Sequence, residues 1–358
     1  MSKARELASL GNAYSDGALS NRNLIINGAM QVAQRGTTST FTGMHTVDRF
    51  SCDFFDVSIT QSKVAITSGG AFDAGFRSAL KAEVTSAAST GATYTFLYQQ
   101  IEAQNVANSG WDCTNPASYI TLSFWVRSSI SGTFYTDVRT NDGTAYGYTK
   151  SFSLSANVWT KVTQTISGNP NLTVADDNGV GLLVGIVPYF GTNLTDPSRA
   201  EGWAALGAYT SITPDYAQNW CGTNGNTFEI TGVQLEVGDT ATPFEHRSIG
   251  QELALCQRFY QQIIGAGDAA FNCTIWHPSY ANTYSSTHEF AVPMRATPST
   301  THTYLDMHKP EVRFDPILST GMYPKPWGVG IVYNTQNYDS NSIVAQVRDH
   351  NIYLDAEL

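Results

Sequence analysis

The chain has 358 residues and a formal net charge of −10, and only 14% of its residues are charged, against about 25% in an average globular protein. The acid excess and the lack of a basic run exclude a protein that binds a nucleic-acid backbone, because such binding needs clustered Lys and Arg. The length suits two domains, and the abundance of Gly, Tyr and Phe favours strands and tight turns over helices.

The cysteines and the apolar segments indicate whether the protein binds a metal and whether it enters a membrane. The five cysteines are scattered and form no CxxC pair, so the spacing common in zinc sites is absent. We expect ordinary buried thiols in a chain made in bacterial cytoplasm, with no metal and no cofactor. The N-terminus has no apolar core of signal-peptide length, and the longest apolar stretch, 180–190, is too short to span a bilayer. The sequence therefore predicts no membrane insertion.

The first residues suit a short helical arm. Ser2 can cap a helix over 2–10, and Gly11 can end it. A helix this short is not stable alone in water, so it must dock on another surface. We therefore expect residues 1–22 to form a docking arm.

From residue 24 to residue 244 the pattern is β throughout. Short segments of alternating polarity are separated by Gly, Asn, Asp and Pro turns, without amphipathic helices between them. This pattern predicts an all-β fold, an antiparallel sandwich or jelly roll over 23–246. The expected strands are 24–34, 46–55, 57–66, 78–86, 94–102, 118–128, 132–140, 145–154, 158–167, 180–190 and 227–237.

Segments 120–127 and 133–140 form the best-defined pair. Each alternates apolar and polar residues, and the short connection between them predicts a hairpin with one buried face and one polar face. The register of this hairpin would place Val126 opposite Phe134, Leu122 opposite Val138, and Trp125 opposite Tyr135.

After residue 246 the pattern predicts a linking helix over 247–265. Ser248 and Gln251 form a capping box, and Gly265 can end the helix. The helix could pack on its own sandwich, or it could associate with other copies around an axis. The residues with 4-3-4-3 spacing, which would form that oligomer interface, are Ile249, Leu253, Cys256, Tyr260 and Ile263.

Residues 266–358 return to β signals, with many Pro and Gly residues between them. They predict a second, smaller C-terminal β-domain. The expected strands are 270–276, 285–293, 299–305, 327–334 and 342–354.

Several segments follow one another in an order that is specific when they are taken together. They are NRNLIINGAM (21–30), QRG (34–36), TVDRF (46–50), QIE (100–102), ITLSFWVRSS (120–129), GVQLEVG (232–238), ATPFEHR (241–247), ELALCQRFY (252–260) and VPMRATP (292–298). Together they resemble bacteriophage tail-fibre proteins that carry a carbohydrate-binding-module-like jelly roll. The resemblance implies a virion protein at the tail or particle surface, often a homotrimer, that contacts the host surface and has no catalytic motif. It also implies binding to other virion tail or capsid proteins, which we assign to residues 2–20, and to a host cell-surface polysaccharide.

Aromatic residues near amides and charges are the candidates for sugar binding. On the predicted polar sheet face these are Trp125, Tyr135, Arg127 and Asp137; on loops they are Trp111, Trp203, Tyr209, Tyr216 and Trp220. The alternatives are burial of the sheet pair under a second sheet or another chain, and loops that pack a small core of their own.

Catalysis and metal binding have little support in the sequence. No serine elbow is present, and the acids cannot be paired from spacing alone. Asp48, Asp176 and Glu236 could hold a structural calcium ion, but the spacing of a calcium loop is absent. We therefore expect a non-enzymatic, short tail-fibre or receptor-binding protein. The alternatives are a structural capsid-surface or tail adaptor without a ligand, and a polysaccharide-degrading spike.

Overall fold

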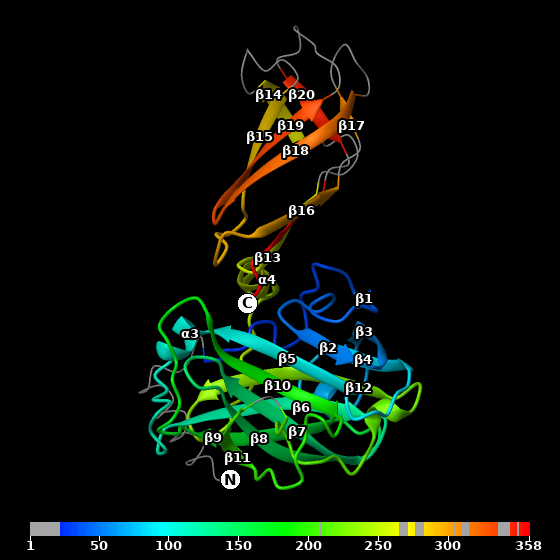
Figure 1. Ribbon diagram of the computed structural model, residues 1–358, viewed down its shortest axis with the longest axis vertical. Helices are drawn as coiled ribbons and strands as arrows, with labels where there is room; N and C mark the ends of the chain where they lie inside the picture. The colour runs from blue at the N-terminus through cyan, green and yellow to red at the C-terminus, as the bar shows by residue number, and fades with distance from the viewer. Residues whose placement is uncertain are drawn as a thin grey trace. The chain divides into compact units, whose positions relative to one another are not determined.

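The computed structural model describes residues 22–207, 210–264, 271–275, 283–303, 306–308, 315–335, 344–348 and 351–358. The chain divides into two compact units, one reaching to Glu252 and one from Leu253 to Glu357 (Figure 1). The predicted helix at 2–10, and the docking segment 2–20, lie outside the described residues. Within the described residues, no helix is long and apolar enough to cross a membrane.

The first unit is built from two six-stranded antiparallel sheets, which confirms the predicted all-β sandwich. In spatial order, sheet I contains β1 (Thr38–Ser39), β3 (Ser58–Ala65), β4 (Ser78–Ser86), β12 (Thr227–Val237), β6 (Tyr119–Ser128) and β9 (Thr160–Ser167). Sheet II contains β11 (Gly202–Ala205), β8 (Tyr146–Leu154), β7 (Gly132–Thr140), β10 (Val180–Phe190), β5 (Tyr94–Glu102) and β2 (Ser51–Phe55). The short helices of this unit are α2 (Gly70–Asp73), α3 (Ala103–Ala107) and the 3-10 turn η1 (Trp220–Gly222).

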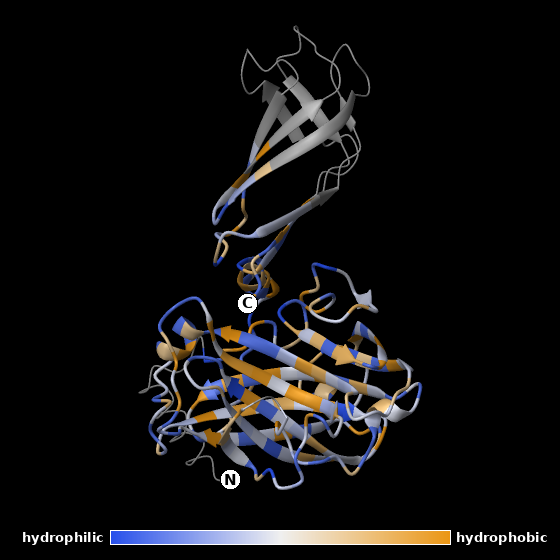
Figure 2. Ribbon diagram, viewed as in Figure 1, coloured by the Kyte–Doolittle hydropathy of each residue, from blue (hydrophilic) through white to orange (hydrophobic). Residues whose placement is uncertain are grey.

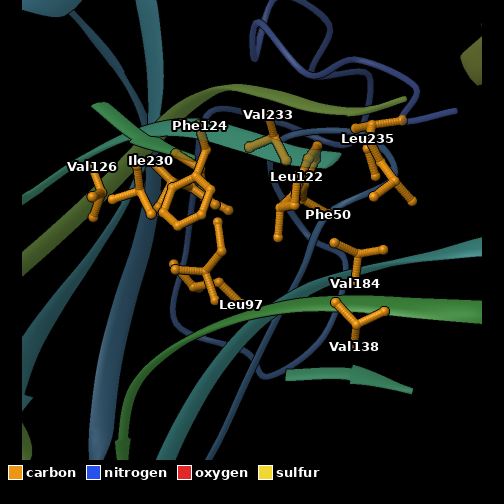
Figure 3. Packing of buried hydrophobic residues seen from close by; sticks show 14 of the residues in the cluster. Phe50, Leu97, Leu122, Phe124, Val126, Val138, Val184, Ile230, Val233 and Leu235 are labelled. Atoms are coloured by element: carbon orange, nitrogen blue, oxygen red, sulfur yellow. The ribbon is translucent and has the colours of Figure 1, made fainter. Parts of the chain in front are cut away.

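The core lies between the two sheets because most strands alternate apolar and polar residues, and one apolar set from each sheet points inward. Figure 2 shows apolar and polar residues mixed along the strand ribbons. Figure 3 shows Leu122, Phe124 and Val126 of β6 facing Leu97 of β5 and Val138 of β7 across the interior. All of these side chains are fully buried. Fully burying one such side chain stabilises the fold by about 1.5–3 kcal/mol.

The predicted strand over 24–34 is wrong. Residues 22–37 form an irregular segment in which Asn27 and Met30 have positive φ angles of 59° and 56°. The side chain of Asn27 replaces the missing strand partners: its Nδ2 donates to the carbonyls of Val32 and Asp48, and its Oδ1 accepts from the backbone of Gln31 and Val32. Asparagine tolerates the left-handed region and bonds to nearby backbone, which favours this turn over a strand.

The predicted hairpin between 120–127 and 133–140 is also wrong in its pairing. β6 pairs with β12 and β9 in sheet I, whereas β7 pairs with β10 and β8 in sheet II. The connection between them passes from one sheet to the other, and the backbone N–H of Ser129 bonds to Thr227 of β12. The predicted faces are nevertheless correct, because alternation fixes which side of a strand is buried but not which strand lies next to it. Leu122, Val126, Phe134 and Val138 all point into the core.

The linking helix is shorter than predicted. α4 spans Ile249–Gln257, and its capping box is confirmed: the backbone N–H of Ser248 donates to Oε1 of Gln251, and the backbone N–H of Gln251 donates to Oγ of Ser248. After Gln257 the chain turns and enters strand β13 (Tyr260–Ile264), so Tyr260 and Ile263 are not on the helix. The predicted stripe is therefore helical only as far as Cys256, and its assignment as an oligomer interface stays a prediction.

The second unit is also built of strands, as predicted. β13, β21 (Asn351–Asp355) and β16 (Ser299–Thr303) form a three-stranded sheet. A closed barrel contains β14 (Phe271–Ile275), β15 (Thr283–Glu289), β19 (Gly328–Thr335), β18 (Asp315–Lys325), β17 (Asp306–His308) and β20 (Val344–Arg348). Strand β18 was not predicted, because Pro316, Gly321 and Pro324 read as turn residues.

Candidate functional site

A pocket of about 250 Å³ opens on the outer face of sheet II. We call it the sheet II pocket. Its residues come from four neighbouring strands and from the long segment that follows β10. They are Asp53, Tyr94, Phe96, Tyr98, Arg139, Leu183, Phe190, Leu194 and Ile212.

Strand geometry brings these side chains together. Tyr94, Phe96 and Tyr98 are two residues apart on β5, so they share one face. Asp53 of β2 lies opposite Phe96 on one side, and Phe190 of β10 lies opposite Tyr94 on the other. The next strand, β7, adds Arg139 opposite Leu183 of β10.

Gly185 forms the floor under Phe96. A Cβ atom at this glycine would lie 2.1 Å from Cε2 of Phe96 and 2.4 Å from its Cζ. Since no side chain can stand there, the ring lies directly over the backbone of β10. The glycine therefore permits the close approach of an aromatic ring to the sheet.

The aromatic rings form a continuous ladder from the exposed edge to the buried centre of the pocket. Phe55 stacks on Tyr94 at 6.3 Å between ring centroids, and Tyr94 meets Phe190 at 6.2 Å. Phe190 then meets Phe96 edge to face at 5.4 Å, and Phe96 stacks on Tyr98 at 4.8 Å. These distances are those of favourable aromatic contacts, so the ladder is a packed and preformed surface.

Polar groups lie at one end of this ladder. The hydroxyl of Tyr98 donates to Oδ2 of Asp53 at 3.0 Å, and the hydroxyl of Ser51 donates to Oδ1. Burial raises the pKa of Tyr98 to about 12, with a further contribution from the charge of Asp53, so the phenol keeps its proton at neutral pH. Burial likewise raises the pKa of Tyr94. The pocket therefore offers a carboxylate and two protonated phenols.

Arg139 supplies a guanidinium group whose charge is paired with that of Asp137. Its guanidinium carbon lies 5.2 Å from the centroid of Phe96, and its Nε donates to Oδ2 of Asp137 at 2.5 Å. Asp137 is fully buried, and its Oδ1 has no hydrogen-bond partner in the described part of the chain. Burial raises the pKa of this carboxyl, against the opposing charges of Arg139 and Arg199. Asp137 lies two residues before Arg139 on the same face of β7; it orients the guanidinium but is not among the residues that line the pocket.

The predicted sheet-face group is split between the two sheets. Trp125 and Arg127 lie on β6 of sheet I, while Tyr135 and Asp137 lie on β7 of sheet II. Arg127 is held by both carboxylate oxygens of Glu229, at 2.8 and 2.7 Å. The prediction that these four residues share one face is wrong, because the two strands belong to different sheets.

The predicted loop aromatics mostly pack inside the first unit. Trp111 is nearly buried and Trp220 is completely buried, with its Nε1 donating to the carbonyl of Thr227. Trp203 donates from Nε1 to the carbonyl of Ser167 and packs against the core. Tyr216 packs edge to face on Tyr135, and Tyr209 lies outside the described residues. Trp111 and Trp220 cannot reach a ligand, which corrects their prediction as binding residues.

Sequence reasoning missed Asp53, Tyr94, Phe96 and Tyr98. The signal was present: aromatic residues at every second position of 94–98 must share one face of a strand. The position of Asp53 had no such signal, because it depends on β2 pairing with β5 across about forty residues of intervening chain.

The candidate calcium ligands are occupied by hydrogen bonds. Asp48 accepts from the backbone and the side chain of Gln34, and Glu236 accepts from the backbone and hydroxyl of Thr242. Asp176 accepts from Asn108. Among the residues that the structure describes, no group of three or more His, Cys, Asp or Glu side chains could hold a metal ion.

No protein-family model matches the sequence, and no curated protein matches it. Among solved structures, the three described next match part of this chain with TM-scores of 0.29 to 0.32. The enzymatically active domain of tailspike protein 4 of bacteriophage CBA120 is 13% identical, with a TM-score of 0.32; the match covers 60% of this chain and 21% of the tailspike chain. A Bacteroides thetaiotaomicron protein described as sugar binding is 16% identical, with a TM-score of 0.32, over 61% of this chain and 100% of that one. A carbohydrate-binding module of family 4 is 10% identical, with a TM-score of 0.29, over 59% of this chain and 98% of the module.

Proposed function

We propose that this chain is a carbohydrate-binding virion appendage, and that the sheet II pocket holds a sugar unit of a host-surface glycan. The observation that carries this proposal is the preformed aromatic ladder with Asp53 and Arg139 beside it. Sugar rings present apolar C–H faces that pack on aromatic rings, and their hydroxyls need both donors and acceptors at the edge. The pocket supplies both kinds of group.

The proposed activity is binding without catalysis. Of the described residues that line the pocket, Asp53 alone is acidic, whereas glycoside hydrolysis generally uses two carboxyl groups flanking the bond that breaks. Asp137 cannot be the second, since its carboxyl is fully buried and bonded to Arg139. Release of reducing ends from a host polysaccharide by the purified chain would contradict this part of the proposal.

The location of this chain on the virion is proposed from the resemblance of its sequence to tail-fibre proteins. Under this proposal residues 2–20 bind another virion protein, the chain forms a homotrimer, and the sandwich faces the host. A mass measurement in solution tests the trimer, and a monomer would contradict it. Antibody labelling of particles at the tail, together with inhibition of adsorption by the purified chain, would support the receptor-binding role. Labelling over the capsid without any effect on adsorption would instead support a structural surface protein.

A panel of bacterial surface glycans tests the pocket itself. The full chain is expected to retain a subset of the panel, and isothermal titration then gives Kd for the best ligand. Tyr94→Ala removes a half-buried ring of the aromatic ladder and is expected to weaken binding at least tenfold. The matched control is Tyr119→Ala on sheet I, an exposed tyrosine outside the pocket. Equal affinity of the two variants, or a panel without any binder, would contradict the assignment.

A further inference from the structure

A second pocket, of about 260 Å³, lies on the outer face of sheet I. We call it the sheet I pocket. The two sheets pack their inner faces together, so this pocket faces away from the sheet II pocket. It shares no residue with the first pocket; its lining is Ala74, Phe76, Ser123, Trp125, Lys161, Gly232, Pro243, Phe244 and His246.

The floor of this pocket comes from three neighbouring strands. Ser123 and Trp125 alternate outward on β6, and Lys161 of β9 lies directly opposite Trp125. On the other side of β6, the register of β12 shifts between Thr231 and Gln234, and Gly232 within this bulge has a φ of 61°. A Cβ at Gly232 would lie 2.5 Å from Cζ of Phe76, so the glycine leaves room for that ring against the sheet.

The wall is a triad of rings from two separate loops. Phe76 follows α2, whereas Phe244 and His246 follow β12. The ring centroids of Phe76 and Phe244 are 4.9 Å apart, and His246 lies 4.9 Å from Phe244 and 5.4 Å from Phe76. Arg22 holds the loop that bears Phe244, because its guanidinium donates a hydrogen bond to the carbonyl of Pro243 at 3.1 Å. The wall is therefore preformed, like the ladder of the first pocket.

Three polar groups that can donate line this pocket without a partner in the described part of the chain, and the imidazole of His246 lies beside them. The hydroxyl of Ser123, the indole N–H of Trp125 and the ammonium of Lys161 make no hydrogen bond or ion pair with any residue that the structure describes. Among the residues that the structure describes, no acidic side chain lines the pocket. Arg127, next to it on β6, adds no uncompensated charge because it is paired with Glu229. The charge of Lys161 thus stands beside aromatic faces in a protein whose net charge is −10.

We propose that the sheet I pocket binds a carboxylated sugar, with the sugar ring against Trp125 and the Phe76–Phe244 wall and the carboxylate on Lys161. A carboxylate accepts hydrogen bonds only, which suits a pocket that offers a cation, an indole N–H and a hydroxyl and has no acidic side chain among its described lining residues. The aromatic wall suits the apolar face of a sugar ring. The chain then carries two glycan sites of different charge preference on opposite faces. This inference does not depend on the sheet II pocket, since the two linings are separate.

The test uses the full chain and isothermal titration with tetragalacturonate, an oligomer of a uronic acid. Its fully methyl-esterified form is the matched ligand, because it keeps the sugar rings and removes the charges. The chain is expected to bind tetragalacturonate at least tenfold more tightly than the ester. Lys161→Gln keeps most of the side-chain stem and removes the charge, and is expected to weaken binding at least tenfold, or about 1.4 kcal/mol.

The control variant is Lys150→Gln on β8, a lysine that lines neither pocket. It is expected to bind tetragalacturonate as the unmodified chain does. Because Lys161 is exposed, its replacement leaves the fold intact, which a thermal melt confirms. The proposal is overturned if the unmodified chain does not bind tetragalacturonate, if the ester binds equally well, or if Lys161→Gln matches Lys150→Gln. It is also overturned if Tyr94→Ala abolishes this binding while Lys161→Gln does not, because the ligand would then occupy the sheet II pocket.

Discussion

The hydroxyl of Tyr98 donates to Oδ2 of Asp53 over 3.0 Å, and this bond joins the end of the aromatic ladder to the acid of the sheet II pocket. The bond orients the carboxylate, while Ser51 fixes its other oxygen. A ligand hydroxyl therefore meets an acceptor that is already in place, which lowers the ordering cost of binding.

Replacing Tyr98 by Phe keeps the ring and removes the hydroxyl. We expect glycan affinity to fall about tenfold, because the carboxylate of Asp53 loses a partner and its orientation. Titration of the best panel ligand measures the change. Tyr119→Phe on sheet I is the control and should leave Kd unchanged; a Tyr98→Phe variant with unchanged Kd would show that the hydroxyl has no part in binding.

Replacing Gly185 by Ala should close the sheet II pocket from its floor. The new Cβ would overlap Phe96 at 2.1 Å, so the ring must leave its position. Overpacking of this kind costs about 1–3 kcal/mol of stability, and we expect binding to be lost in the folded protein. Urea unfolding and titration at a temperature well below the melt measure the two effects separately.

The control for that substitution is Gly207→Ala, because a Cβ there meets no atom within 4 Å. It should change neither stability nor Kd. If Gly185→Ala bound the glycan normally, the position of the Phe96 ring would not matter for the ligand.

The buried carboxyl of Asp48 predicts how the free energy of unfolding depends on pH. Burial raises the pKa of its carboxyl above 3.8, in spite of the bonds from Gln34 and the charges of Arg35 and Arg49. The native chain then holds this proton at a pH where the unfolded chain has lost it, so the contribution of this group to stability falls as pH rises from about 3.8 through the raised pKa. Asp48→Asn cannot ionise. The free energy of unfolding of the unmodified chain minus that of Asp48→Asn should therefore decline as pH rises from 4 and then level off.

Urea unfolding at pH 4, 5, 6 and 7 measures that difference. Asp196 is the control, because hydrogen bonds from Ser198 lower the pKa of its carboxyl. For Asp196→Asn the same difference should be flat over pH 5–7. A flat profile for Asp48→Asn as well would mean that its carboxyl titrates alike in both states.

A substitution of Trp220 tests whether this residue belongs to the core and not to a sugar-binding loop. Trp220 is 0% exposed, and its indole N–H donates to the carbonyl of Thr227. We expect Trp220→Ala to cost about 3–5 kcal/mol of stability by leaving a cavity. Trp327→Ala, which removes a side chain that is 65% exposed, should change stability by less than about 0.5 kcal/mol. Chemical denaturation distinguishes the two, and a small loss for Trp220→Ala would contradict its place in the core.

The sequence predicted strand positions far better than strand partners. The limits of β4, β5, β7, β10 and β12 agree with expectation, because alternation and turn residues are local properties. Partners depend on the whole chain: β6 and β7 are consecutive, yet they lie in different sheets. A short polar connection such as 129–131 suits a hairpin and a crossing between sheets equally well, so local pattern could not separate the two.

For the candidate site, the sequence predicted the kinds of side chain but not which of them lie together. Aromatic side chains beside a charge were the right kind of group, but Trp125 and Tyr135 proved to lie on opposite faces. Trp125 belongs instead to the sheet I pocket, together with Phe244 and His246 from a loop more than a hundred residues away in sequence. Such a combination follows from tertiary packing and has no signature in the spacing of residues.

The central position of β12 determines when sheet I can be completed during synthesis. β12 lies between β4 and β6, so residues 227–237 must leave the ribosome before the two halves of sheet I can join. Until then the facing edges of β4 and β6 present unpaired backbone groups, which are prone to pair with other chains. A nascent chain stopped before residue 227 is therefore expected to need a chaperone or to aggregate, whereas one that has passed residue 237 can close the sheet by itself.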